Sequence, residues 1–328
     1  MNYFFLKLKN LALFILLNKI FHIFLKIVIF ITSIYFVYSK INLNTLNINY
    51  NYFNFNYLII VFVLQTLGAY FILLRWKNLL ETASSIKYYN KQLLSSIVYS
   101  NVSHEFSFIS FFLTRLVFVS KIKVKLNQLF STIIIEKIFS IYSILIIFVI
   151  ANIIIINFYN YKKFIYLNTI FIYVAFFLIA TLIILILINI NLVKFKSLME
   201  KIFFFKYFIS YIDYRNIVKP FYYTFLIQIF SFLILINIPF FLNIELNIFN
   251  FLIFLPIVTF VSALPVSFTQ WGYRESVFIF FYGLIGIDSN IIFTISITYG
   301  ILGTLIFMSH VIFYEVSKFL FYKNNNQN

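Results

Sequence analysis

Apolar runs long enough to cross a lipid bilayer recur along this chain from Phe21 almost to its end. A helix needs about 20 residues to span the hydrocarbon core, and a chain in lipid must satisfy its backbone polar groups internally. Of the 328 residues, 63% are hydrophobic and 10% are charged, and the mean hydropathy is +1.00. This composition excludes a soluble globular fold and predicts an all-α, polytopic helical membrane protein.

Hydropathy predicts eight membrane crossings and leaves no stretch for a soluble domain. We expect one integral membrane domain over residues 1–323, an Asn-rich tail over residues 324–328, and no soluble catalytic domain. The expected spans are Phe21–Tyr38, Tyr57–Leu74, Gln128–Ile156, Phe164–Ile190, Pro220–Leu242, Ile248–Leu264, a shorter Gly272–Ile287, and Ile291–Phe319.

The segment Gln92–Phe112 is too polar for a span that faces lipid. It holds six serines together with Asn101, His104 and Glu105. Such a segment is tolerated at membrane depth only where protein covers it or water reaches it. We therefore expect a re-entrant or protein-covered segment that returns to the side it left.

The distribution of basic residues predicts the orientation. With Gln92–Phe112 treated as re-entrant, 20 of the 25 Lys and Arg fall on one side, and only Lys40, Lys162 and Lys163 fall opposite. Cytoplasmic loops carry the excess of Lys and Arg, so we expect both termini in the cytoplasm, at a bacterial inner (plasma) membrane. The net charge of +16 is spread along these loops and forms no stripe for nucleic acid, whereas anionic lipid headgroups suit it.

The residues Leu264–Ser276, LPVSFTQWGYRES, place Arg274 beside Glu275 where proline, glycine and tryptophan gather. Pro265 breaks a helix and Gly272 relaxes the backbone, which predicts a helix start at this point. Backbone N–H groups and a guanidinium together suit a lipid phosphate. The alternative is that Arg274 and Glu275 form only a structural salt bridge.

Other ionisable side chains within the predicted membrane region are functional candidates by default. Glu136 and Lys137 either neutralise each other or line a polar cavity. A structural role is favoured for Glu315, because Lys318, three residues further along the helix, can pair with it. For His310 two roles are possible: a hydrogen bond to a neighbouring helix, or a step in a proton relay. The remaining candidates are His22, His104 and Glu105.

The chain resembles the lysylphosphatidylglycerol synthase transmembrane region, or flippase-like integral membrane, family. The family pattern Leu-Pro-x-Ser, then a glycine-containing turn, then Gly-x-Arg-Glu is matched by Leu264, Pro265, Ser267, Gly272, Arg274 and Glu275. Upstream, LLRWKNLL (Leu73–Leu80) is similar to the family's Arg-Trp, and IIIEKIFSIYSI (Ile133–Ile144) to its acidic-basic pair. The three matches occur in family order.

One family segment is rewritten. Where the family has Gly-Gly-Asp-x-x-Arg, this chain keeps Arg115 but has Ser110, Phe111 and Phe112 in place of Gly-Gly-Asp. Thr269 and Gln270 likewise replace glycines of the later turn. His104 and Glu105 are our hypothesis for the side chains that supply the missing polarity.

The resemblance implies translocation of an anionic or aminoacylated phospholipid or glycolipid between leaflets, through a polar cavity. The expected headgroup-binding residues are Arg274, Glu275, Gly272, Ser267, Arg115, Glu136, Lys137, His104 and Glu105. We expect no enzymatic activity, cofactor or metal, membrane lipids as partners, and a separate enzyme for any lipid modification. The alternative is a non-transporting scaffold subunit of an envelope glycolipid or polysaccharide system. A metal-dependent transferase is disfavoured because the chain has no Asp-x-x-Asp cluster.

Overall fold

The computed structural model describes residues 26–41, 53–106, 108–119, 124–158, 173–174, 176–177, 180–181, 214–262, 264 and 271–325. Within these ranges every regular element is an α-helix, which confirms the all-α prediction. A first helix covers residues 26–40 and so includes residues 26–38 of the first predicted span, Phe21–Tyr38. The predicted span Phe164–Ile190 lies outside the described residues except at a few positions.

Four helices in the described part of the chain are long and apolar enough to cross a membrane. They are α2 (Phe55–Ser84), α5 (Leu126–Phe158), α9 (Tyr214–Phe241) and α12 (Ser289–Asn325). With a rise of 1.5 Å per residue, the shortest, of 28 residues, reaches about 42 Å, more than the roughly 30 Å of hydrocarbon. Each corresponds to one predicted span.

Two pairs of shorter helices form hairpins. The first pair is α3 (Asn90–Phe106) with α4 (Phe108–Val119), and the second is α10 (Ile248–Ser262) with α11 (Tyr273–Gly283). The longest of the four has 17 residues, about 26 Å, which is less than the hydrocarbon thickness. The first hairpin confirms the re-entrant segment predicted at Gln92–Phe112.

The second hairpin differs from our prediction of two full crossings over Ile248–Leu264 and Gly272–Ile287. Helices α10 and α11 have 15 and 11 residues, so each passes only part of the way through the membrane. Hydropathy recognises apolar runs but does not report the depth at which the chain turns back. Because the chain leaves this hairpin on the side where it entered, the directions of the neighbouring spans are unaffected.

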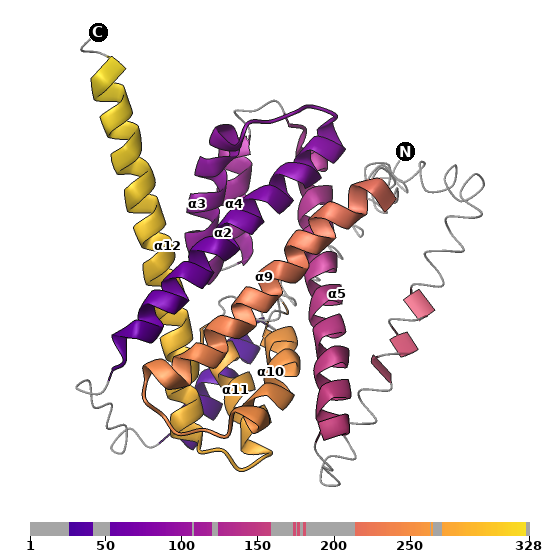
Figure 1. The fold of residues 1–328 in the computed structure, drawn as a ribbon, viewed down its shortest axis with the longest axis vertical. Coiled ribbons are helices and arrows are strands. Elements are labelled where there is room, and N and C mark those ends of the chain that lie inside the picture. The colour runs from indigo at the N-terminus through magenta and orange to yellow at the C-terminus, as the bar shows by residue number, and fades with distance from the viewer. Residues whose placement is uncertain are drawn as a thin grey trace, which may run out of the picture.

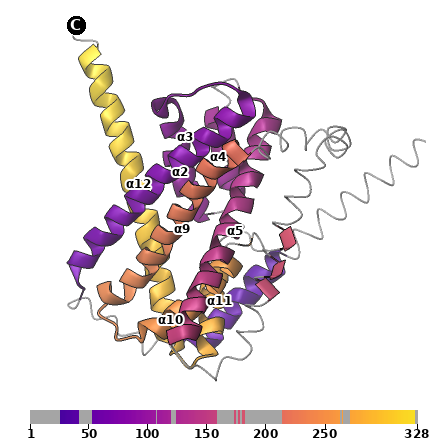
Figure 2. The same cartoon turned by 45° about the vertical axis from the view of Figure 1, so that its right-hand side comes forward.

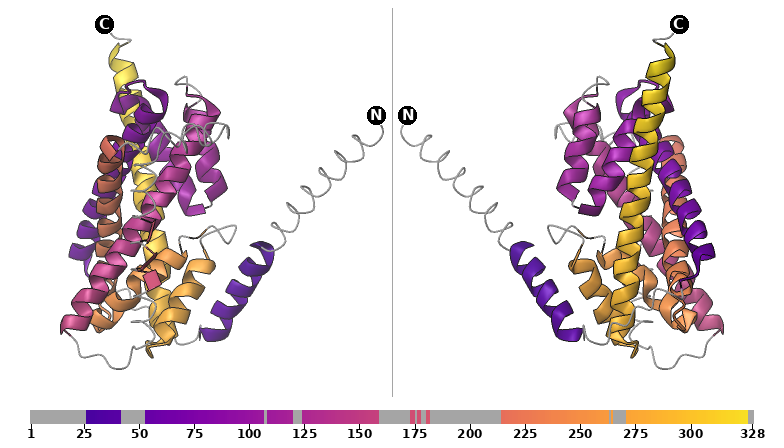
Figure 3. Two further views of the ribbon diagram at one scale, coloured as in Figure 1. Left: turned by 90° about the vertical axis from the view of Figure 1, so that its right-hand side faces the viewer. Right: turned by 90° about the vertical axis from the view of Figure 1, so that its left-hand side faces the viewer.

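The two hairpins enter from opposite ends of the molecule (Figures 1 and 3). The last residues of α2 and α12 and the first residues of α5 and α9 lie at the same end of the molecule (Figure 1). The first hairpin opens at this end, and the second opens at the opposite end (Figure 1). Helices α2 and α9 lie side by side and run in opposite directions (Figure 2), and α5 and α12 also run in opposite directions (Figure 1). The order long helix, hairpin, long helix therefore occurs twice, with inverted direction.

Side-chain caps and one aromatic anchor hold the second hairpin. The Asn247 carboxamide oxygen accepts from the backbone N–H of Phe249 at 3.1 Å and so caps α10. Gly272 begins α11 with φ +81°, a conformation that favours glycine. The Tyr282 hydroxyl donates to the Phe251 carbonyl at 2.8 Å, and the two rings stack at 4.9 Å. The contacts between Tyr282 and Phe251 join the end of α11 to the start of α10.

Single-cysteine labelling tests this topology, because the parent chain has no cysteine. Lys87→Cys before the first hairpin and Lys125→Cys after it should react with an impermeant thiol reagent from the same side of sealed vesicles. Glu245→Cys and Leu284→Cys, which flank the second hairpin, should react from the opposite side. All four positions are exposed. Labelling of the two flanks of either hairpin from different sides would contradict the re-entrant assignment.

Candidate functional site

A cavity of about 460 Å³ is lined by residues of both hairpins, among them Glu105 near the end of α3 and Arg274 at the start of α11. Four cationic side chains line it, and they come from α2, α4, α5 and α11. Two carboxylates, Glu105 and Glu136, share the lining with His104. The ionisable lining residues are Arg75, His104, Glu105, Arg115, Glu136, Lys137 and Arg274.

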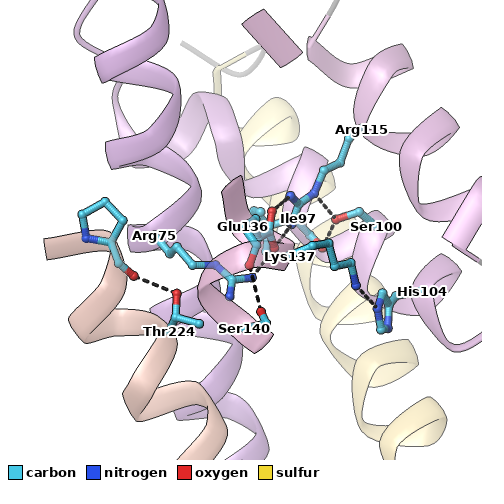
Figure 4. A network of polar contacts seen from close by, with 10 residues as sticks. Arg75, Ile97, Ser100, His104, Arg115, Glu136, Lys137, Ser140 and Thr224 are labelled. Carbon is cyan, nitrogen blue, oxygen red and sulfur yellow. Dashed lines mark hydrogen bonds and ion pairs between the residues drawn. The ribbon is translucent and has the colours of Figure 1, made fainter. Parts of the chain in front are cut away.

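Glu136 lies between two arginines (Figure 4). Its carboxylate accepts hydrogen bonds from Arg75 of α2 on one side and Arg115 of α4 on the other. All three side chains are buried. One negative charge thus neutralises only one of two guanidinium groups, and the group as a whole stays positive.

Two aromatic rings contact the guanidinium of Arg115. Its guanidinium carbon lies 4.0 Å from the centre of the Trp76 ring and 4.1 Å from the centre of the Phe111 ring. A cation over the face of an aromatic ring is stabilised by the ring quadrupole, and more so when water is excluded. The Arg115 Nε also donates to the Ser100 hydroxyl at 3.4 Å. These contacts orient Arg115 toward Glu136.

Lys137, next to Glu136 on α5, faces the first hairpin. Its Nζ lies 3.4 Å from Nε2 of His104 (Figure 4) and 5.7 Å from the centre of the Phe111 ring. Glu136 and Lys137 therefore do not simply neutralise each other: Glu136 joins the arginines, and Lys137 extends the positive lining toward α3.

At the second hairpin, Arg274 turns back on its neighbour Glu275. Its Nη2 and Nε donate to Glu275 Oε1 at 2.8 and 3.1 Å. The other carboxylate oxygen accepts the backbone N–H of Gly272 at 2.5 Å, and the Ser296 hydroxyl donates to Oε1 at 3.3 Å. Glu275 is thus the cap of α11, and it occupies one of the N–H groups that we predicted for a phosphate.

The structure brings most of the predicted site residues together. Arg115, Glu136, Lys137, His104, Glu105 and Arg274 line one cavity, although they lie far apart in the sequence. Glu275 and Gly272 lie behind Arg274 at the start of α11. Ser267 lies outside the described residues.

Sequence reasoning missed Arg75 as a cavity residue and counted it, like Arg115, among the loop cations. Both are buried within helices, at 5% and 0% exposure. The Arg-Trp of the family pattern was the one signal for Arg75. Nothing in the sequence pointed to Tyr299, whose ring lies 5.5 Å from the Arg274 guanidinium carbon.

The other candidates have structural partners. His310 of α12 contacts the Thr66 hydroxyl of α2 at 3.0 Å, which is a hydrogen bond between helices. Glu315 pairs with Lys318 at 3.8 Å, as predicted, and accepts from the Tyr99 hydroxyl at 2.6 Å. His22 lies outside the described residues. No group of three or more His, Cys, Asp or Glu among the described residues is arranged to hold a metal ion.

The cavity is lined by more cationic than anionic side chains and lies among helices long enough to cross a membrane, which defines an integral membrane protein with a positively charged internal cavity. A sequence model of the lysylphosphatidylglycerol synthase transmembrane region matches residues 23–309. The chain therefore belongs to that family, which ties it to the handling of membrane lipids. A search of curated proteins and one of solved structures found no match.

The Arg75–Glu136–Arg115 group leads to a stability prediction. Glu136→Gln leaves two buried guanidinium groups without a counter-charge, and breaking a buried pair in this way costs about 3–5 kcal/mol. Lys137→Met should cost far less, because Glu136 keeps both arginines. Thermal unfolding in detergent should therefore show a much lower Tm for Glu136→Gln than for Lys137→Met. Equal losses would contradict the central role of Glu136.

Proposed function

We propose that this protein binds the anionic headgroup of a membrane lipid in the cavity and moves it between leaflets. The observation that carries the proposal is the charge imbalance of the lining, where four cations face two carboxylates. Even when Glu275 behind Arg274 is counted, one positive charge is left over. An unbalanced charge at membrane depth is costly, and a bound phosphate would neutralise it.

The chemistry of the lining suits a phosphate in particular. Arginine offers parallel N–H donors that match phosphate oxygens, and Lys137 adds a flexible point charge. A volume of about 460 Å³ falls within the range of small-molecule pockets, roughly 300–1,000 Å³, and suits a headgroup but not its acyl chains. The acyl chains would stay in lipid beside the exposed apolar faces of the long helices.

The inverted order of helices supports transport over a fixed scaffold. Transporters with inverted repeats bind substrate near the bilayer midplane, beside interrupted helices, and expose the site to each side in turn. Here the hairpin tips supply the interrupted helices. On this proposal the protein is no enzyme, its termini face the cytoplasm of a bacterial inner membrane, and a separate enzyme makes any modified lipid. The substrate is an anionic or aminoacylated phospholipid or glycolipid.

Purified protein in liposomes, assayed with a panel of headgroup-labelled lipids, tests the proposal. The parent should exchange one anionic or aminoacylated class between leaflets and leave neutral lipids in place. Lys137→Gln should slow the exchange about 10-fold or more, because a hydrogen bond to a charged group contributes roughly 1.5–3 kcal/mol. Lys318→Gln, on an exposed part of α12, is the matched control and should behave as the parent.

Two outcomes would count against this assignment. A folded Lys137→Gln protein that transports at the parent rate would remove Lys137 from the site. Parent protein that moves no lipid of the panel would favour the scaffold function instead.

A further inference from the structure

Arg274 has a single carboxylate partner, and that partner does not depend on it. Among the described residues, the one ion pair that Arg274 forms is with Glu275. Glu275 has two further donors, the Gly272 N–H at 2.5 Å and the Ser296 hydroxyl at 3.3 Å. If Arg274 moved away, Glu275 would still cap α11 and both of its oxygens would still accept a hydrogen bond.

The pairing is also an unusual one for a helix. Neighbouring residues point in different directions from the helix axis, so side chains at i and i+1 do not normally face each other. Arg274 has to bend back toward Glu275 at the first turn of α11. Its remaining support comes from the rings of Trp271 and Tyr299, 5.2 and 5.5 Å from the guanidinium carbon. Rings of this kind allow a guanidinium to slide, since they fix no hydrogen-bond geometry.

Glu105, at the end of α3, is in the opposite situation. The four ion pairs formed among the described residues do not include it. Its side chain lines the same cavity as Arg274 and lies close enough to interact with it electrostatically. A carboxylate at membrane depth with no cation beside it is costly, so a nearby mobile cation is attracted to it.

Two glycines of α12 connect these positions. A Cβ placed on Gly300 would clash with Nη2 of Arg274, so the guanidinium lies where a side chain would be. A Cβ on Gly303 would lie 3.7 Å from Oε1 of Glu105. The two glycines are three residues apart, about 4.5 Å along the axis and on neighbouring positions of one helix face. Arg274 and Glu105 thus lie against one smooth strip of α12.

We propose that Arg274 exchanges between Glu275 and Glu105 along the glycine strip of α12, and that pairing with Glu105 draws the end of α3 and the start of α11 together. The described structure is then the open arrangement, with Arg274 on Glu275 and the cavity between the tips. In the other arrangement Glu105 of the first hairpin holds Arg274 of the second, and the cavity is closed at that point. The role of this exchange as a gate rests on the proposed transport; the exchange itself does not.

The inverted order of the helices explains how a single arginine, Arg274, can be paired in both arrangements. Each hairpin belongs to a different half of the chain, and rocking of one half against the other moves the tips past each other. An ion pair that forms between the tips in one arrangement and within one hairpin in the other keeps Arg274 paired throughout. Arg274 is therefore never left without a counter-charge in the membrane during the change.

A stability cycle tests the exchange without any lipid assay. Glu275→Gln keeps one oxygen that can accept the Gly272 N–H, and its NH2 group can donate to the Ser296 hydroxyl, but it gives Arg274 no charge, so Arg274 should move to Glu105. Glu105→Gln should then lower Tm by several degrees in the Glu275→Gln background, and should leave it unchanged or raise it in the parent. A Glu105→Gln effect of the same size in both backgrounds would overturn the proposal.

Gly300→Ala and Gly303→Ala give a matched second test that leaves every charge in place. A methyl group at position 300 would displace the guanidinium from its present position, whereas a methyl group at position 303 would make an ordinary contact. Glu105→Gln should therefore lower Tm in the Gly300→Ala protein and not in the Gly303→Ala protein. An identical response of the two glycine variants would overturn the exchange.

Lipid transport, measured in parallel on the same proteins, separates this proposal from the proposed function. If the Tm coupling appears and the parent moves no lipid, the exchange stands and the transport function fails. If lipid moves and the coupling is absent, transport stands and the exchange is overturned.

Discussion

The cost of burying charge at membrane depth governs this structure. Glu136 accepts from Arg75 and Arg115, and so joins α2, α4 and α5 at one point inside the helical assembly. Removing a carboxylate from such a group leaves uncompensated charge in a medium that solvates it poorly. Yet two arginines and one glutamate do not balance. The same contact that holds the first half of the protein together also leaves the positive charge that makes the cavity attractive to an anion.

The short hairpins place helix ends within the membrane, where backbone groups without helical partners are costly. Side chains near the cavity provide hydrogen bonds to these groups. A helix that begins or ends within the membrane has backbone N–H or C=O groups without helical partners. At the start of α11, Glu275 accepts the Gly272 N–H. At the other tip, the Ser110 hydroxyl donates to the Ser103 carbonyl at 2.6 Å. Glu275 and Ser110 thus satisfy backbone groups in the two hairpins, next to the cavity that Glu105 and Arg274 line.

Much of the fold was predictable from the sequence because lipid restricts a chain to a few solutions. The all-α class, the re-entrant segment at Gln92–Phe112 and the helix start after Gly272 follow from hydropathy, polarity and backbone chemistry. Depth was not predictable: α10 and α11 have apolar sequences typical of spans but turn back. Arg75 and Arg115 were counted among the loop cations for the same reason, although the family pattern also predicted Arg115 as a site residue. A charge near the end of an apolar run can lie in solvent or inside the protein, and only packing decides which.

The rewritten Gly-Gly-Asp segment has a physical explanation in the cavity. Phe111 contributes a ring to Arg115, so one replacement supports a cavity residue directly. Phe112, at the position of the family aspartate, packs instead against Phe130, with ring centres 4.5 Å apart, and does not line the cavity. Loss of an acid at that position leaves Glu105 and Glu136 as the carboxylates of the described lining. With fewer negative charges near Arg115 and Lys137, the described lining keeps its net positive charge, and Glu105 is the one lining carboxylate outside the ion pairs of the described residues.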